Sequence, residues 1–133
     1  MWFTRKAQPA IRSLVGEGTV LHGEVRFADG LRIDGEVQGD IVADPALPSL
    51  LVISENARVT GKVSAGHVII CGAVVGPVVS HQLLELQPKA SITGNVRYEM
   101  LEMHPGARID GELKPHKPSE DKPALKLAVA KEA

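Results

Sequence analysis

The stretch LELQPKASITGNV, residues 84 to 96, decides the fold, because LEMHPGARIDGEL at 101 to 113 repeats its pattern at an offset of 17. In both segments apolar and polar residues alternate, a proline follows, and a step of the form Ile-x-Gly-x-aliphatic closes the segment. The matching positions are Leu84 and Leu101, Leu86 and Met103, Pro88 and Pro105, Ala90 and Ala107, Ile92 and Ile109, Gly94 and Gly111, and Val96 and Leu113. The two segments are copies of one structural unit.

Two further copies lie upstream. LVISENARVTGKV, residues 51 to 63, begins far enough before Leu84, at an offset of 33, to leave room for one more unit between them. Val68 and Ile70 mark that unit, because they follow Leu51 and Ile53 at an offset of 17. The period is therefore continuous over the second half of the chain.

The same period extends to the start of the repeat region. LVGEGTV (14 to 20) and LRIDGEV (31 to 37) align at an offset of 17, which places Leu14 over Leu31 and Val20 over Val37. Units that begin near 14, 31, 50, 67, 83 and 100 make six coils.

One insertion interrupts the period. Gly35 and Gly61 are separated by an offset of 26 rather than 17, and ADPALPS at 43 to 49 contains two prolines. Proline and its polar neighbours favour a turn or loop over a strand. We expect residues 43–49 to bulge from one corner of the repeat.

The repeat predicts an all-β, single-domain parallel β-helix over residues 14–115. Apolar residues paired at i and i+2 and followed by Gly or Pro indicate short strands joined by bends. A unit this short cannot bury its own apolar face, so the copies must stack and share one core. Three short strands would form each coil, and six coils would make a rod about 30 Å long. Gly61, Gly94 and Gly111 fall at corners, where positive φ or close backbone approach is needed.

Composition fits one soluble domain. The 133 residues are 44% hydrophobic, 3% aromatic and carry a formal net charge of −1, so the core is aliphatic and nucleic acid is not an expected partner. Cys71 is the single cysteine, which excludes an intramolecular disulfide and favours a reducing compartment. No secretory signal is visible, and the longest apolar run, residues 68–79, is too short to span a bilayer. We expect a cytoplasmic protein.

No pattern typical of catalysis is present, so we expect a protein that is not an enzyme and has no catalytic, cofactor-binding or metal-binding residues. A stacked metal site would need histidines at multiples of 17, and no two of the five histidines have such a spacing. Nucleophile elbows, nucleotide-binding loops and paired cysteines are absent from the sequence. Glu85 and Glu102 recur at 17 and are expected on a solvated outer face.

Both ends of the chain leave the repeat. Residues 1–13, MWFTRKAQPAIRS, combine Trp2 and Phe3 with Arg5 and Lys6. Tryptophan favours the headgroup level of a membrane and nearby basic residues are drawn to anionic lipid, so these four residues are candidate membrane anchors. An alternative is that Trp2 packs back onto the first coil. Residues 116–133 are rich in Pro, Lys and acids and are expected to be a disordered tail, although residues 124–133 could form a short helix on a partner.

With these features together, the chain resembles the bactofilins. The resemblance rests on six coils with a period near 17, on the Ile-x-Gly-x-Val steps, on the two tails and on the MWFTRK start. The steps lie at Ile33 to Val37, Val59 to Val63, Ile92 to Val96 and Ile109 to Leu113. In the family pattern Phe more commonly follows Met1 directly, whereas here Trp2 intervenes.

The resemblance implies a fold and a function. The fold is a right-handed triangular β-helix. The function is that of a bacterial cytoskeletal scaffold that polymerises without nucleotide into non-polar filaments. The family is often bound to the inner face of the cytoplasmic membrane and organises cell-wall or morphogenesis proteins. Self, anionic lipid and such proteins are the expected partners, with no nucleotide and no cofactor.

Assembly would use the two ends of the solenoid, where core residues of the terminal coils have no neighbour. The candidates are Leu14, Val20 and Phe27 at the near end, and Leu101, Met103, Ala107, Ile109 and Leu113 at the far end. Val52 and Ile69 point outward and stack at an offset of 17, so they are a candidate lateral contact between filaments or with a partner.

Two alternatives remain open. Hexapeptide-repeat acyltransferases and related β-helical carbonic anhydrases have a stricter period of 18 and a histidine at the subunit interface. Here the offsets are 17, 16 and 17, and no histidine recurs. The second alternative is a β-helical adaptor that never polymerises, and electron microscopy of the purified protein separates it from a filament former.

Overall fold

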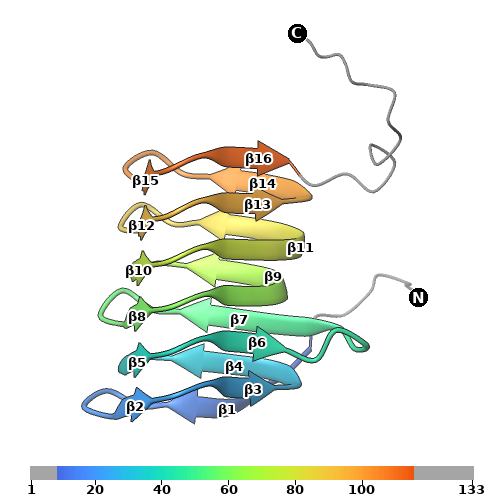
Figure 1. Ribbon diagram of the computed structural model, residues 1–133, viewed down its shortest axis with the longest axis vertical. Coiled ribbons are helices and arrows are strands. Elements are labelled where there is room, and N and C mark those ends of the chain that lie inside the picture. The colour runs from blue at the N-terminus through green and yellow to red at the C-terminus, as the bar shows by residue number, and fades with distance from the viewer. Residues whose placement is uncertain (1–8, 116–133) are drawn as a thin grey trace, which may run out of the picture.

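The structure, a computed structural model, describes residues 9–115 and shows a stack of strands that wind upward from the N-terminal to the C-terminal side (Figure 1). All strand pairs among the described residues are parallel, and no helix occurs there. The strands are β1 (Ile11–Val15), β2 (Val20–His22), β3 (Val25–Phe27), β4 (Asp29–Ile33), β5 (Glu36–Gln38), β6 (Ile41–Ala43), β7 (Ser49–Ile53), β8 (Arg58–Thr60), β9 (Val63–Ile70), β10 (Ala73–Val75), β11 (Val78–Leu86), β12 (Ser91–Thr93), β13 (Val96–Tyr98), β14 (Met100–Met103), β15 (Arg108–Asp110) and β16 (Leu113–Pro115). The predicted all-β parallel solenoid is confirmed.

The strands form three faces and six coils. The first face stacks β1, β4, β7, the second half of β9, the second half of β11, and β14. The second face stacks β2, β5, β8, β10, β12 and β15. The third face stacks β3, β6, the first halves of β9 and β11, β13 and β16. Because β9 and β11 each continue past a corner, sixteen strands supply three segments to each of six coils. Coils are numbered 1 to 6 from the N-terminal end.

The expected register holds from coil 3 onward on the first face. Leu51 pairs with Val68, Val68 with Leu84, and Leu84 with Leu101. These four side chains form one inward column, and aliphatic columns of this kind build the core on every face. The core is one continuous cluster of Val, Ile, Leu and Ala side chains, most of which have no solvent exposure in the central coils.

The expected register of coil 1 is wrong. The structure pairs Leu14 with Arg32, Val15 with Ile33 and Leu21 with Val37, so neither Leu14 over Leu31 nor Val20 over Val37 occurs. The offset is 18 on the first face and 16 on the second, because the corner after β1 has four residues and the corner after β4 has two. An alignment at 17 fits neither face, and a slip of one residue turns a strand's side chains to the opposite face.

The consequence for the near end is a different set of inward residues. Val15 is buried at 7% exposure, while Leu14 and Val20 lie on the outer surface with 60% and 48% of their area exposed. Leu21, Val25 and Phe27 pack against the core. Phe27 is the one near-end candidate that the structure places there.

A column of six glycines marks the corner between the second and third faces. All six have φ between 117° and 154°, a region that side chains rarely adopt. A Cβ atom on Gly61 would lie 2.2 Å from the carbonyl oxygen of Gly39, so the backbone approach also requires glycine. The members are Gly23, Gly39, Gly61, Gly76, Gly94 and Gly111. The corner role predicted for three of them is confirmed.

The inserted loop lies at the corner between the third and first faces. It spans residues 44–48, between the end of β6 and the start of β7. The predicted segment 43–49 therefore includes one strand residue at each side. Ser49 anchors the end of the loop, because its buried Oγ accepts a hydrogen bond from the backbone N–H of Gly66 at 2.8 Å.

The described chain enters and leaves at this same corner. β1 begins at Ile11, within the segment assigned to the N-terminal tail, and β16 ends at Pro115. The first face begins with β1 and the third ends with β16, so both points lie along one edge of the rod at opposite ends (Figure 1).

Candidate functional site

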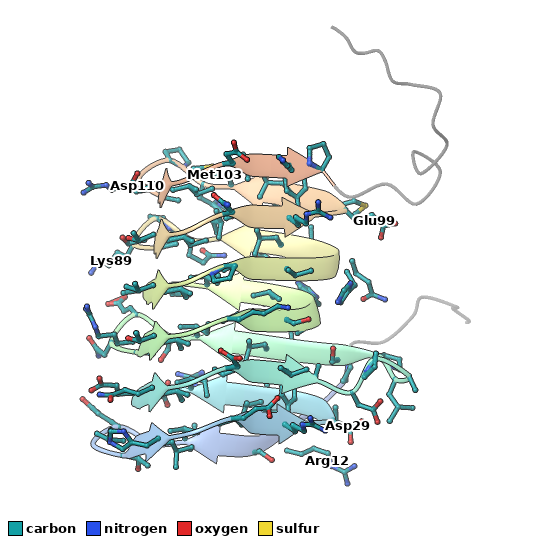
Figure 2. All side chains as sticks on the ribbon, in the orientation of Figure 1. Arg12, Asp29, Lys89, Glu99, Met103 and Asp110 are labelled. Atoms are coloured by element: carbon teal, nitrogen blue, oxygen red, sulfur yellow. The ribbon has the colours of Figure 1, made fainter. Side chains whose placement is uncertain are left out.

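The far end of the rod exposes a section through the core. Coil 6 pairs with coil 5 on one side, and no strand among residues 9–115 pairs with its other side. Leu101, Ala107 and Ile109 are only partly buried, and Met103 and Leu113 have 45% and 40% of their area exposed. Figure 2 shows Met103 at this end of the stack.

Coil 5 shows what a cover would add to coil 6. Each inward residue of coil 6 has a counterpart one coil earlier, and all the counterparts are at most 1% exposed. The counterparts are Leu84, Leu86, Ala90, Ile92 and Val96. The five far-end candidates are therefore core residues that lack the next coil, together with the unpaired backbone groups of β14, β15 and β16.

The near end is less exposed. Val15 is buried, and Leu21, Val25 and Phe27 are partly covered by coil 2. A salt bridge joins β1 to β4 at this end, with Arg12 Nη1 3.1 Å from Asp29 Oδ2 (Figure 2). Asp29 has φ of 65°, the one positive value for a non-glycine residue in the described chain. This end combines one aromatic side chain with small aliphatic ones.

The lateral candidates form a short outward row on the first face. Val52 pairs with Ile69, and both are half-buried. The same row continues to Arg32 on one side and to Glu85 on the other, so charges border the apolar pair. Cys71 lies beside Ile69 in one shallow groove, and burial together with the charge of Glu55 raises the pKa of its thiol. A thiol with a raised pKa is less reactive, which agrees with a structural role.

Some features of the surface were not foreseen from the sequence. Met100 is the most exposed hydrophobic residue of β14, and Leu47 in the inserted loop is half exposed. The exposure of Met100 could have been predicted, since the residue occupies the outward position before Leu101 in the repeat. The membrane candidates Trp2, Phe3, Arg5 and Lys6 lie outside the described residues.

Fold and surface together define a class of protein. Among the described residues, no element covers either end of the solenoid, and its core is aliphatic. The strands of the first and last coils therefore have a hydrogen-bonded neighbour on one side only. No helix in residues 9–115 is long and apolar enough to cross a membrane. Such a rod is a structural solenoid with two surfaces suited to stacking.

The family follows from comparison with known proteins. The family model described as "Bactofilin: Polymer-forming cytoskeletal" matches residues 13–114, and the chain belongs to this family of structural proteins. Bactofilin BacO of Myxococcus xanthus is 25% identical over 95 residues, which cover 71% of this chain and 72% of the relative. No solved structure gives a significant match. The resemblance stated from the repeat is confirmed.

Proposed function

We propose that this protein is a cytoskeletal scaffold subunit that assembles end to end into non-polar filaments without nucleotide. The observation that carries the proposal is the exposed section of core at coil 6. Met103 and Leu113 keep 45% and 40% of their area in solvent although their counterparts in coil 5 are fully buried. A second copy at this surface would complete their burial.

The energetics favour such a junction. Full burial of a large apolar side chain contributes about 1.5–3 kcal/mol. The four large far-end residues are already partly buried, so completing their burial would supply several kcal/mol in total. The backbone groups at the open edge would also find partners. When two far ends meet about a two-fold axis, the same patch serves both copies and the strands run antiparallel across the junction. Near ends that meet in the same way extend the filament without polarity.

The test compares two arginine substitutions on β15. Ile109 points inward and is half-buried, and its neighbour Asp110 points outward. Ile109→Arg should remain folded and β-rich by circular dichroism but monomeric or dimeric by sedimentation, because a charge replaces the apolar centre of the junction. Asp110→Arg should form filaments in electron micrographs, as wild type does.

Two results would contradict the proposal. Filaments of normal length from Ile109→Arg would exclude the far end as a junction. A purified wild-type protein that stays monomeric without nucleotide would instead support the non-polymerising adaptor.

We further propose that the N-terminal tip attaches the filament to the inner face of the cytoplasmic membrane, where it positions cell-wall or morphogenesis proteins. Support comes from the residue types at Trp2, Phe3, Arg5 and Lys6. Full burial of the two aromatic rings is worth at most about 3–6 kcal/mol, and each basic residue adds about 1 kcal/mol near anionic lipid. One tip therefore binds weakly, with a Kd on the order of micromolar to millimolar.

Polymerisation would make this weak attachment effective. A filament presents many tips, so avidity can exceed the single affinity by about 10²–10⁴. Changing Trp2 and Phe3 to Ser should leave filaments intact but release them from anionic vesicles in a sedimentation assay. Ile109→Arg, with its tip unchanged, should also bind far more weakly. Equal binding by Ile109→Arg and wild type would show that avidity is not the mechanism.

The Val52 and Ile69 pair is proposed as a lateral contact. Burying two half-exposed aliphatic side chains is a small gain for one subunit, but the contact repeats along a filament. Val52→Glu combined with Ile69→Glu should abolish bundles in electron micrographs and leave single filaments. Unchanged bundles in this double variant would count against the lateral contact.

A further inference from the structure

Two carboxylates lie side by side on the outer surface of coils 5 and 6. Glu85 of β11 pairs in register with Glu102 of β14, and both point away from the core. Like charges directly opposite one another destabilise a pair of strands. Some other outward carboxylates are paired with a lysine or arginine, as in Arg32 with Asp34 and Lys89 with Glu55.

A histidine completes this cluster. His104 follows Glu102 by two residues, and a ring nitrogen of His104 lies within 4.8 Å of a carboxylate oxygen from each glutamate. Nε2 of His104 is buried and has no hydrogen-bond partner in the described structure. A buried polar atom without a partner costs free energy, so the cluster as it stands leaves one potential ligand atom unsatisfied.

The position of Glu85 is already fixed by its neighbours. Gln87 donates a hydrogen bond from Nε2 to Glu85 Oε2 at 3.0 Å, and His67 Nε2 lies 3.6 Å from Glu85 Oε1. Groups that orient a ligand in this way are typical of metal sites, where they raise affinity. Glu102 is exposed and can rotate toward an incoming ion.

We propose that Glu85, Glu102 and His104 form a site for a divalent transition-metal ion of the zinc type. Two carboxylate oxygens and one imidazole nitrogen are a donor set that suits Zn²⁺, with water in the remaining position. Mg²⁺ and Ca²⁺ favour a shell made of oxygen atoms only. Ligands about 2.0–2.2 Å from a shared ion are roughly 3.5 Å apart, so the three atoms, now within 4.8 Å of one another, need only small side-chain rotations to share one ion.

The ion would link the last coil to the body of the rod. Glu85 belongs to coil 5, while Glu102 and His104 belong to coil 6, which has a neighbour on one side only. Binding would replace repulsion between the two carboxylates by shared attraction to one cation. The ion therefore stabilises the coil whose outer side carries Met103 and Leu113.

The first experiment measures binding of ZnCl₂ to the full chain by calorimetry. Wild type should bind one ion with an affinity that His104→Ala and Glu102→Gln each lower by at least roughly 10–100-fold, the loss that follows from removing even an outer-shell partner of a ligand. His81→Ala is the matched control, because His81 is an exposed histidine on another part of the surface, where it contacts Ser64. Excess Mg²⁺ should not compete. Equal zinc affinity in wild type and His104→Ala would overturn the proposal.

A second experiment uses thermal unfolding and does not depend on filaments. With EDTA, Glu102→Gln should melt at or above the temperature of wild type, because the substitution removes the repulsion. With ZnCl₂ the order should reverse, because wild type gains a ligand that the variant lacks. If the two proteins melt in the same order with EDTA and with ZnCl₂, the proposed site is wrong. The same comparison in the Ile109→Arg background separates this result from assembly, which could fail without affecting the metal.

Discussion

The two ends of the solenoid are built from the same repeat but differ in regularity. Coils 5 and 6 pair at an offset of 17 on all three faces, as shown by Leu86 with Met103 and Ile92 with Ile109. Coils 1 and 2 pair at 18 on the first face and at 16 on the other two. The difference comes from the lengths of the corners. Where the corresponding corners of two neighbouring coils are equally long, the offset is the same on every face. Where they differ in length, the offset changes from one face to the next.

The two ends also differ in how much of their inward-facing side chains is exposed to solvent. The far end leaves two inward side chains at least 40% exposed, whereas the near end buries Val15 and half-covers Phe27. A regular, aliphatic far end and an irregular near end with one aromatic ring should not contribute equally to stability or assembly. Four predictions test this comparison.

The largest effect is expected for a leucine one coil away from the far end. Leu84 is fully buried and stacks directly on Leu101, which is only partly buried. In the non-assembling Ile109→Arg background, Leu84→Ala should lower the free energy of unfolding by about 2–5 kcal/mol. Leu101→Ala should lower it by about 1 kcal/mol, because less area is removed from the core. Urea unfolding gives both values, and equal losses would show that coil 6 is already covered.

The second prediction uses the two ends of the glycine column. A Cβ on Gly111 would lie 2.1 Å from the carbonyl oxygen of Gly94, whereas a Cβ on Gly23 would have no atom within 4 Å. Both residues have φ in the left-handed region, at 154° and 117°. Gly111→Ala should therefore cost about 3 kcal/mol or more, and Gly23→Ala about 1 kcal/mol, the strain of φ alone.

Thermal unfolding of the two alanine variants measures this difference. Gly16→Ala is the control, because its Cβ would have no atom within 4 Å and its φ is ordinary. If Gly23→Ala were as costly as Gly111→Ala, the near end would carry a neighbour that fills the space beneath coil 1.

The third prediction separates the inward and outward residues of the near end. Phe27 packs against the core, while Leu14 and Val20 point outward. Phe27→Arg should shorten filaments or stop growth at dimers joined by their far ends. Leu14→Arg should have a much smaller effect on filament length in electron micrographs. A stronger effect at Leu14 would mean that the near-end junction uses the outer surface of coil 1.

The smallest effect concerns the short corner after β4. Ser54 of coil 3 donates its hydroxyl hydrogen bond to Asp34 of coil 2, and this bond, opposed by partial burial and aided by Arg32, lowers the pKa of the Asp34 carboxyl. A carboxyl with a lowered folded-state pKa stabilises the protein above its ordinary pKa of 3.8 and loses that contribution as the pH falls through the folded value.

Asp34→Asn tests the sign of this effect. The variant should be slightly less stable than wild type at neutral pH, and the difference should shrink below pH 3.8 and disappear once the pH falls below the lowered pKa of the folded state. Asp110→Asn, at the exposed end of β15, is the matched control for removal of a carboxylate. A difference that grows in acid would contradict the assignment.

Much of the architecture could be predicted from the sequence. Alternation of apolar residues determined the strands, and the offset of 17 between Leu84 and Leu101 determined the stacking, because both depend on local side-chain pattern. The register of coil 1 could not be predicted, since the corner after Val15 is two residues longer than the corner after Ile33, so the offset changes from 18 to 16 and an alignment at 17 fits neither face. The cluster around His104 was missed because histidines were compared only with one another, whereas its partners are glutamates.

The chain enters and leaves the rod along one edge, and this arrangement sets a spacing in the proposed filament. Six coils at about 4.8 Å make a subunit about 29 Å long. If like ends meet, two N-terminal segments emerge together at each near-end junction, so paired segments recur about every 58 Å along the polymer. The C-terminal segments recur at the same interval, midway between them. In such a filament the positions of the N-terminal and C-terminal segments would alternate at a fixed distance of about 29 Å.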